Sequence, residues 1–310
     1  MTKSISILIP CYNANKWICR AIESAISQVN CIPEIIVADD GSTDRSVEII
    51  KSFGDRIKLI SASHQGGNAA RNILLENASG EWVQFLDADD EIASDKIATQ
   101  LQYIDHNVDA VYGSVTLQWW EDDSLINSMV SEPSREVDLY SHWFNWQLAQ
   151  TGSVLWRASS LRNIGGWNET VTCCQDNELT LRALKHGLRF VQSNDAGAIY
   201  RIWSDQTVCR RDPTMLIKMK TSLIDEMILW LKEHSKLTPL HLEIAGAACF
   251  SMARSLYQID PIAAKEYARE RVARKVFNFN KAPFHLKTTM SFLGFSVTEQ
   301  LASFVRKTRV

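Results

Sequence analysis

The sequence predicts an α/β protein with a mostly parallel sheet covered by helices on both faces, followed by a helical C-terminal region. Two observations lead to this fold class. In about the first hundred residues, short runs rich in Ile and Val alternate with segments whose apolar residues have helical spacing. From about residue 214 onward, the apolar spacing is helical throughout. Strands that alternate with helices are typical of parallel sheets buried on both faces.

The individual elements follow from the same pattern. Strands are predicted at 5–9, 34–38, 58–62 and 82–86, and helices at 17–26, 46–53, 68–77 and 95–106. Gly54 and Gly80 end two of these helices. A strand-like run follows at 109–119, and the polar, turn-rich stretch 121–136 predicts a surface excursion. Further helices are predicted at 214–231, 242–257 and 263–277, with a boundary near residue 213.

The composition is that of a folded protein without excess positive charge. The 310 residues are 45% hydrophobic and 22% charged, with a formal net charge of −3. These values exclude collagen, coiled coil and wholesale disorder, and they argue against a nucleic-acid partner. The seven cysteines are scattered without CxxC pairs, which argues against a zinc site and a disulfide framework. With no signal-peptide pattern before Pro10 and no apolar run of about 20 residues, we expect a cytoplasmic protein.

Acidic residues follow two of the predicted strands, at the sheet edge where parallel α/β proteins bind ligands. Asp39 and Asp40 precede a Gly-Ser-Thr-Asp turn, which suits either helix capping or a ligand whose N–H and hydroxyl groups donate to a carboxylate. Asp87, Asp89 and Asp90 follow the fourth strand. Because neighbouring carboxylates repel one another, they predict a divalent cation, Mg²⁺ or Mn²⁺; an acidic capping loop is the alternative.

The segment QGGNAARN at 65–72 places two glycines at the start of a predicted helix. It matches neither the Walker A loop nor the GxGxxG motif of dinucleotide-binding proteins. A helix N-terminus can bind an anion, and Arg71 adds positive charge there. A simple helix start explains the segment equally well.

Together these segments resemble glycosyltransferase family 2, the inverting enzymes of the GT-A fold. The resemblance rests on SILIPCYN, IIVADDGSTD, GGNAARN, GEWVQFLDADD and QDNELTLRALKHG, in that order, and covers roughly residues 4–205. It implies a GT-A type (Rossmann-like) mixed sheet. We therefore predict a catalytic domain at 1–213, with a nucleotide-sugar half at about 1–107 and an acceptor half at about 108–213. The helical C-terminal region is then 214–310.

The resemblance implies roles for residues on the nucleotide side. Pro10, Tyr12 and Asn13 match the segment that faces the nucleotide, with Tyr12 able to lie against the base. Asp40 matches the acid that accepts the N–H of the base, which favours uracil, although thymine and guanine also offer a donor. Arg71 is expected to contact the substrate.

The resemblance also implies a metal site. Asp87, Ala88 and Asp89 match the family's DXD motif, in which the first acid reaches the ribose or the waters of the metal and the second coordinates the metal. We assign Asp87 and Asp89 to Mn²⁺ or Mg²⁺, and Asp87 and Ala88 to the substrate. The cation would stabilise the negative charge that develops on the departing nucleoside diphosphate.

Asp176 matches the family's general base, which usually follows another acid where this chain has Gln175. Glu178 is the alternative, but residues two positions apart do not share a helix face. The family also tends to have Tyr-Arg-x-His near the end of the catalytic domain, and here Trp203 replaces the histidine. Arg201, with Arg210 and Arg211, is able to reach the diphosphate, although we favour surface arginines.

We predict an inverting, metal-dependent transfer of a sugar from a nucleotide diphosphate sugar, with a UDP-sugar favoured, to a hydroxyl of a glycan, lipid-linked or protein acceptor, as in polysaccharide biosynthesis. One alternative is a sugar-nucleotide nucleotidyltransferase, although residues 10–16 lack the basic glycine loop that it needs. The other is a non-catalytic carbohydrate-binding descendant, against which the intact acids at 40, 87, 89 and 176 argue.

The last fifty residues predict a membrane contact. Residues 261–310 carry ten Lys and Arg against three Glu, together with Phe277, Phe279, Phe284, Phe292 and Phe295. Basic and bulky apolar side chains together favour an anionic membrane, here the cytoplasmic face that carries a lipid-linked acceptor. A solvated basic helix is the alternative. The oligomeric state cannot be predicted.

Overall fold

The computed structural model describes residues 3–121, 123–148, 150–194, 197–203, 212–279, 294–300 and 302. The chain divides into two compact units. The first consists of Met1–Leu139 and Trp146–Asp205, and the second of Tyr140–Asn145 and Gln206–Val310. Each unit is described separately.

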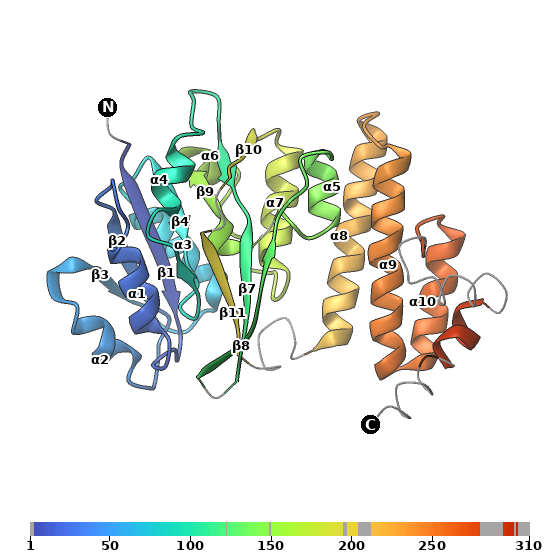
Figure 1. Ribbon diagram of the computed structural model, residues 1–310, viewed down its shortest axis with the longest axis horizontal. Helices are drawn as coiled ribbons and strands as arrows, with labels where there is room; N and C mark the ends of the chain where they lie inside the picture. Colours follow the sequence, from blue (N-terminus) through green and yellow to red (C-terminus); the bar gives the residue numbers. More distant parts are fainter. Residues whose placement is uncertain are drawn as a thin grey trace. The chain divides into compact units, whose positions relative to one another are not determined.

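The first unit is built on a seven-stranded sheet in the order β10-β6-β9-β4-β1-β2-β3 (Figure 1). All neighbouring strands are parallel except β9, which is antiparallel to both β4 and β6. This arrangement confirms the predicted mixed, mostly parallel α/β sheet. The strands are β1 (Ile5–Cys11), β2 (Glu34–Asp39), β3 (Lys58–Ser61), β4 (Trp82–Phe85), β6 (Ala110–Tyr112), β9 (Val154–Arg157) and β10 (Phe190–Gln192).

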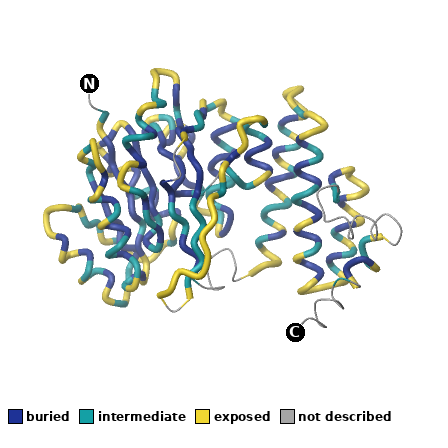
Figure 2. Tube along the Cα trace, viewed as in Figure 1, coloured by how far each residue is buried: buried dark blue, intermediate teal, exposed yellow. Residues whose placement is uncertain are grey.

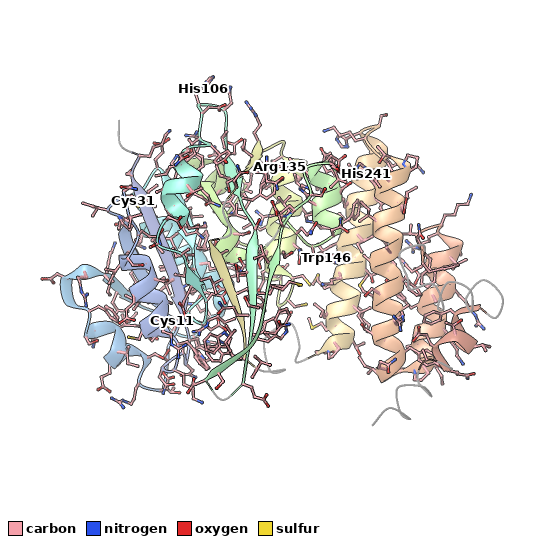
Figure 3. The ribbon with its side chains drawn as sticks, viewed as in Figure 1. Cys11, Cys31, His106, Arg135, Trp146 and His241 are labelled. Carbon is pink, nitrogen blue, oxygen red and sulfur yellow. The ribbon has the colours of Figure 1, made fainter. Side chains whose placement is uncertain are left out.

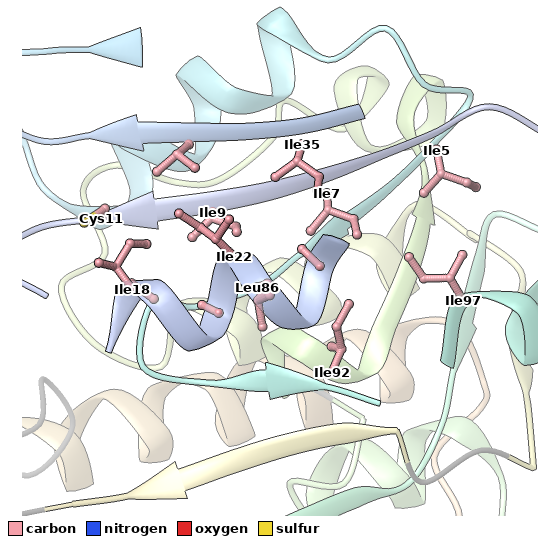
Figure 4. Packing of buried hydrophobic residues seen from close by; sticks show 14 of the residues in the cluster. Ile5, Ile7, Ile9, Cys11, Ile18, Ile22, Ile35, Leu86, Ile92 and Ile97 are labelled. Carbon is pink, nitrogen blue, oxygen red and sulfur yellow. The ribbon is translucent and has the colours of Figure 1, made fainter. Parts of the chain in front are cut away.

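Helices cover both faces of this sheet, with α1 drawn in front of it and α3 behind it in Figure 1. Successive side chains of a strand point to opposite faces. Ile7 and Ile9 of β1 therefore pack with Ile18 and Ile22 of α1, all of them 0% exposed (Figure 4). Burying each such side chain contributes roughly 1.5–3 kcal/mol. The helices and short 3₁₀ turns are α1 (Ile18–Ile26), α2 (Ser46–Lys51), η1 (Gly54–Arg56), α3 (Gly67–Asn77), α4 (Lys96–Leu101), η2 (Thr151–Ser153), α6 (Ala158–Asn163) and α7 (Gln175–Lys185).

A second, four-stranded sheet has the order β5-β11-β7-β8 and was not predicted. The run at 109–119 divides between β6 and β7, which belong to different sheets, and 121–136 contains β8 instead of an irregular excursion. Nearly all of β8 is exposed on both faces, so its sequence has no alternation to reveal a strand (Figure 2). The strands are β5 (Glu91–Ile92), β7 (Val115–Glu121), β8 (Ser124–Ser131) and β11 (Ala198–Ile202).

The second unit is helical, as predicted for the C-terminal region. Its helices are α5 (Leu139–Phe144, from Tyr140 onward), α8 (Pro213–Glu233), α9 (Pro239–Ile259) and α10 (Pro261–Ala273), with a further helical stretch at 294–300. The helices α8, α9 and α10 each begin with a proline, and the residue before that proline caps the helix with its side chain: Asp212, Thr238 and Asp260. The capping side chain accepts from a free backbone N–H group of the first turn, and proline suits the first helical position. Together they define where each helix begins.

Several of the basic and aromatic side chains on which the membrane prediction rests make contacts within the second unit. Arg271 is 1% exposed and forms an ion pair of 2.5 Å with Asp225. Phe277 and Phe295 pack edge to face against each other and against Phe250. Lys281, Phe284, Lys287, Phe292, Arg306, Lys307 and Arg309 lie outside the described residues. Membrane contact stays a prediction. In the part of the chain that the structure describes, no helix is both long and apolar enough to cross a bilayer.

Gly80, between α3 and β4, is a position at which the first unit tolerates no side chain. A Cβ atom there would lie 2.6 Å from the backbone nitrogen of Ser6 in β1. We expect Gly80→Ala to lower the free energy of unfolding by roughly 1–3 kcal/mol, because the strand must shift. Urea unfolding measures this, with Glu76→Ala on the exposed face of α3 as the control. A loss no larger than that of the control contradicts the prediction.

Candidate active site

The carboxyl ends of β1, β2 and β4 meet at one edge of the seven-stranded sheet because these strands are parallel. Cys11, the last residue of β1, pairs with Asp39, the last of β2. Figure 3 shows Cys11 at the lower end of the first unit and His106 at its upper end. Since β9 runs in the opposite direction, its amino end and the preceding η2 reach the Cys11 edge as well. The predicted site residues gather at this edge.

Asn13 holds two loops of this edge together. It has a left-handed backbone, with φ of 50°, which asparagine tolerates better than most residues. Its side-chain oxygen accepts from the backbone N–H of Thr43 at 2.8 Å, and its own N–H donates to the Ser42 hydroxyl at 2.9 Å. Asn13 thus fixes the loop after β2 to the loop after β1. Its predicted contact with a nucleotide stays a prediction, as does that of the half-buried Pro10.

Tyr12, His64 and Asp40 form a stacked and hydrogen-bonded group. The Tyr12 ring is 47% exposed and stacks on His64 with centroids 4.1 Å apart. Nδ1 of His64 lies 2.8 Å from Oδ2 of Asp40. The buried Asp40 carboxylate also accepts from the backbone N–H groups of Gln65 and Gly66, at 2.8 and 2.9 Å. Asp40 therefore holds the turn before α3, in addition to its predicted role toward a base. Sequence reasoning missed His64, which no pattern marks.

Arg71 is a buried cation among the acids of the site. Its Nη2 lies 2.6 Å from Oδ1 of Asp87, and its guanidinium packs over Trp167 at 4.7 Å from the ring centroid. The charges of Asp87, Asp176 and Asp89 all raise the pKa of Arg71, against the effect of burial. Only 8% of the residue is exposed. The structure thus places Arg71 next to the DXD-like segment, and its predicted contact with a substrate stays a prediction.

The three acids after β4 have different surroundings. Asp90 is buried and accepts from the backbone N–H of Arg201 at 2.9 Å and from Nε2 of Gln150 at 3.2 Å, so it is built into the fold. Asp87 and Asp89 are half-buried, with the buried Ala88 between them. Desolvation, and then the charge of Asp87, raise the pKa of Asp89 to about 6.

Asp87 and Asp89 fit a hard divalent cation. Among the described residues, no group of three or more His, Cys, Asp or Glu side chains is arranged to hold a metal ion. Mg²⁺ and Mn²⁺, however, are commonly held by one or two carboxylates, with substrate phosphates and water as the other ligands. Desolvation first, and the charge of Asp87 second, make the ionised form of Asp89 costly, and a bound cation would offset both effects.

Asp176 lies in the first turn of α7 and faces the same group of charges. Its Oδ1 accepts from the Thr151 hydroxyl at 2.7 Å. Desolvation raises its pKa to about 7; Arg71 lowers the value, Asp87 raises it, and the Thr151 hydrogen bond lowers it. The structure thus brings Asp176 together with Arg71 and Asp87, although the three come from distant parts of the chain. A carboxyl group that titrates near neutrality is suited to general-base work.

Glu178, the alternative to Asp176, is engaged elsewhere. Both of its carboxylate oxygens accept from Arg182, at 3.0 and 2.9 Å. The same guanidinium donates to the carbonyl of Gly166 at 2.8 Å. Glu178 therefore supports the loop that precedes α7.

Arg201 is not the surface arginine that we favoured. It is 4% exposed, lies 2.8 Å from Glu91, and packs over Trp120 and Trp203 at 4.0 and 4.6 Å from their ring centroids. The ring of Trp203 also packs against that of Trp17, with the two ring centroids 3.7 Å apart. These aromatic contacts account for the burial of Arg201. Arg210 and Arg211 lie outside the described residues.

The mixed sheet, with β9 antiparallel to its neighbours and acids at the carboxyl ends of the parallel strands, agrees with the GT-A type fold that the sequence predicts. Solved structures of low sequence identity share the fold. Staphylococcus aureus TarS 1–349, in complex with UDP, gives a TM-score of 0.56 at 20% identity over 88% of this chain and 89% of that chain. Mannosyltransferase PcManGT from Pyrobaculum calidifontis, in complex with GDP-Man and Mn²⁺, gives 0.54 at 14% identity over 97% and 87%.

The family follows from sequence. The model of glycosyl transferase family 2 matches residues 6–148. The Escherichia coli UDP-Glc:alpha-D-GlcNAc-diphosphoundecaprenol beta-1,3-glucosyltransferase WfaP is 30% identical over 200 residues, which are 64% of this chain and 77% of WfaP. The chain belongs to glycosyltransferase family 2. It spans only 43% of the length of a Haemophilus influenzae glycosyltransferase that is 46% identical over 107 residues, and 17% of two Rickettsia relatives.

Proposed function

We propose that this protein transfers a sugar from a UDP-sugar to a hydroxyl group of an acceptor with inversion at the anomeric carbon, and that Asp176 is the general base. The observation that carries the proposal is the placement of Asp176 beside Thr151 and among the charges of Arg71 and Asp87, where desolvation raises its pKa to about 7. A base near neutrality combined with the DXD-like pair Asp87 and Asp89 is what a single displacement requires. A non-catalytic descendant would need neither feature, and family membership favours sugar transfer over nucleotidyl transfer.

In this reaction the acceptor oxygen forms a bond to the anomeric carbon while the bond from that carbon to the diphosphate oxygen breaks. The hydroxyl proton passes to the Asp176 carboxylate, and the bonding electrons leave with the nucleoside diphosphate. Asp87 and Asp89 would hold a divalent cation, which when bound supplies Lewis-acid stabilisation of the diphosphate charge. Arg71 forms an ion pair with Asp87, and its positive charge lowers the pKa of Asp176, which favours the ionised form of the proposed base.

Relatives and structural neighbours support the choice of substrates. TarS has been solved with UDP and with UDP-GlcNAc, and WfaP is named for a UDP-Glc donor and a diphosphoundecaprenol-linked acceptor. We therefore propose a UDP-sugar, with UDP-glucose as the first candidate, and an acceptor sugar on a lipid diphosphate. The PcManGT complex with Mn²⁺ supports Mn²⁺ as the cation to test first.

The direct test combines a panel of nucleotide sugars with an alkyl-diphosphate-linked GlcNAc acceptor, in Mn²⁺ and in EDTA. We expect a disaccharide product from a UDP-sugar, with the anomeric configuration opposite to that of the donor, and none in EDTA. A product of retained configuration, or release of inorganic pyrophosphate from a nucleoside triphosphate and a sugar phosphate, contradicts the proposal.

The pKa of Asp176 predicts the acidic side of the pH profile. Only the ionised carboxylate accepts a proton, so kcat/KM should fall about tenfold per pH unit below the pKa. The pKa is about 7 without a cation. Because a cation beside Asp87 stabilises the ionised form further, we expect the acidic limb in Mn²⁺ at or below that value. A profile measured with the wild-type enzyme and saturating acceptor checks this. An acidic limb of kcat/KM that lies well above pH 7 contradicts the prediction.

A further inference from the structure

Thr151, the first residue of η2, is the side chain that binds the proposed base. It is 6% exposed, and its hydroxyl donates to Oδ1 of Asp176 at 2.7 Å. We propose that Thr151 is a positioning residue that orients Asp176 for proton transfer, and that three buried side chains hold it in place. These three, Lys96, Gln84 and Gln100, are called the Lys96 cluster. This inference rests on the proposed role of Asp176.

The Lys96 cluster is hydrogen-bonded to the backbone of η2. Lys96 donates to the side-chain oxygen of Gln84 and to that of Gln100, the latter at 2.8 Å. An ammonium group has only donors, so each amide turns its oxygen to Lys96 and its NH₂ group away from it. Nε2 of Gln84 then donates to the carbonyl of Gly152 at 3.0 Å, and Nε2 of Gln100 to the carbonyl of Ser153 at 2.9 Å. All three side chains of the cluster are 0% exposed.

These bonds are not needed to pair the strands. β9, which follows η2, is already hydrogen-bonded to β4 on one side and to β6 on the other. Burying an ammonium group is costly, and an apolar residue at position 96 would avoid that cost. On the other side of Thr151, Gln150 donates to Asp90 at 3.2 Å. The residue that touches the base is therefore held by hydrogen bonds on both sides, which is the kind of support that a preorganised site needs.

A hydrogen bond to one oxygen of a carboxylate fixes the direction in which the other oxygen points. With Oδ1 of Asp176 engaged by Thr151, no hydrogen bond from a described residue engages Oδ2. Oδ2 is then the oxygen that accepts the proton of the acceptor hydroxyl. The bond also favours the ionised carboxylate, as does Arg71, whereas Asp87 opposes ionisation. The charge of Asp176 also raises the pKa of the buried Asp90, and Glu178 on the same helix is paired with Arg182.

The test compares Thr151→Val, which keeps the shape and removes the hydroxyl, with Thr151→Ser, which keeps the hydroxyl. The assay uses UDP-glucose, Mn²⁺ and the GlcNAc-diphosphate acceptor, or whichever UDP-sugar the panel above identifies. For Thr151→Val we expect kcat to fall about tenfold, with the donor KM unchanged and the acidic limb of kcat/KM moved to higher pH. Thr151→Ser should keep the wild-type limb and most of kcat, because the hydroxyl is retained.

The Lys96 cluster is tested by non-additivity. Lys96→Met should lower kcat in the wild-type background and have little further effect in the Thr151→Val background, because both changes act through one bond. Urea unfolding of each variant reports separately on stability. If Lys96→Met does not fold, Gln100→Leu takes its place.

Unchanged kcat and an unchanged limb in Thr151→Val overturn the inference, as does a Thr151→Ser variant that is equally impaired. Equal effects of Lys96→Met in both backgrounds overturn the part that concerns the cluster. A failure of the proposed function gives a different result. In that case Asp176→Asn retains transfer in the same assay, independently of the result for the Thr151 variants. A wild-type protein inactive with every donor would likewise refute the function itself.

Discussion

Replacement of Asp176 by asparagine is expected to abolish sugar transfer while leaving UDP binding in Mn²⁺ unchanged. Asparagine has nearly the same shape, and its oxygen can still accept from Thr151, as Oδ1 of Asp176 does at 2.7 Å. It cannot take up a proton from an acceptor hydroxyl. Loss of a general base typically costs about 10²- to 10⁴-fold in kcat. Transfer is measured with the acceptor assay, and UDP binding by calorimetry.

The matched control for this change is Glu178→Gln. It removes the same charge from the same helix turn, but at a carboxylate that is engaged by Arg182. We expect near-normal kcat and a modest loss of stability from the weakened ion pair. An active Asp176→Asn enzyme together with an inactive Glu178→Gln enzyme would move the base to Glu178.

The second large effect is expected from Asp89→Asn, which should lower both kcat and the affinity for UDP in the presence of Mn²⁺. Desolvation, and then the charge of Asp87, raise the pKa of Asp89 to about 6, so a bound cation would stabilise the ionised carboxylate. Removing one of two carboxylate ligands weakens cation binding, and with it the stabilisation of the diphosphate. We expect at least about a 100-fold loss of kcat/KM. Titration of UDP at several Mn²⁺ concentrations separates the loss of cation from the loss of nucleotide.

Asp95→Asn is the control, because Asp95 is an exposed acid six positions further along that makes no side-chain cap bond with α4. This variant changes the total charge by the same amount, and we expect its kcat and its affinity for UDP to stay near the wild-type values. If UDP binding to Asp89→Asn depends on Mn²⁺ as it does in the wild type, Asp89 is not a ligand of the cation.

Much of the site could be predicted because its parts follow strands that are visible in the sequence. The acids at 40 and 87–89 come directly after apolar runs, and parallel strands bring such ends together. The prediction of Asp176 depended on resemblance, since nothing local in the sequence places the first turn of α7 near Asp87. The structure now brings its charge next to those of Arg71 and Asp87.

Other parts of the site could not be predicted because their signals are non-local. Nothing in the sequence pairs Thr151 with Asp176, and only the fold brings the two together. His64 is an exposed side chain whose stacking on Tyr12 depends on two loops that meet. Arg201 resembles a surface arginine in the sequence, and only the fold packs it over the rings of Trp120 and Trp203. The strand β8 lacks alternation because both of its faces are exposed.

The position of β9 beside β4, far from it in the sequence, has a consequence for how the protein matures on the ribosome. The chain that forms β1 to β4 is synthesised earlier and can pair at once, whereas the strand that lies beside β4 starts only at Val154 and the helix of the base at Gln175. Until then the hydrogen-bonding edge of β4 is uncovered. Such late, long-range pairing slows folding and exposes an edge to wrong partners. Nascent chains halted before residue 150 should therefore depend on chaperones more than chains halted after α7.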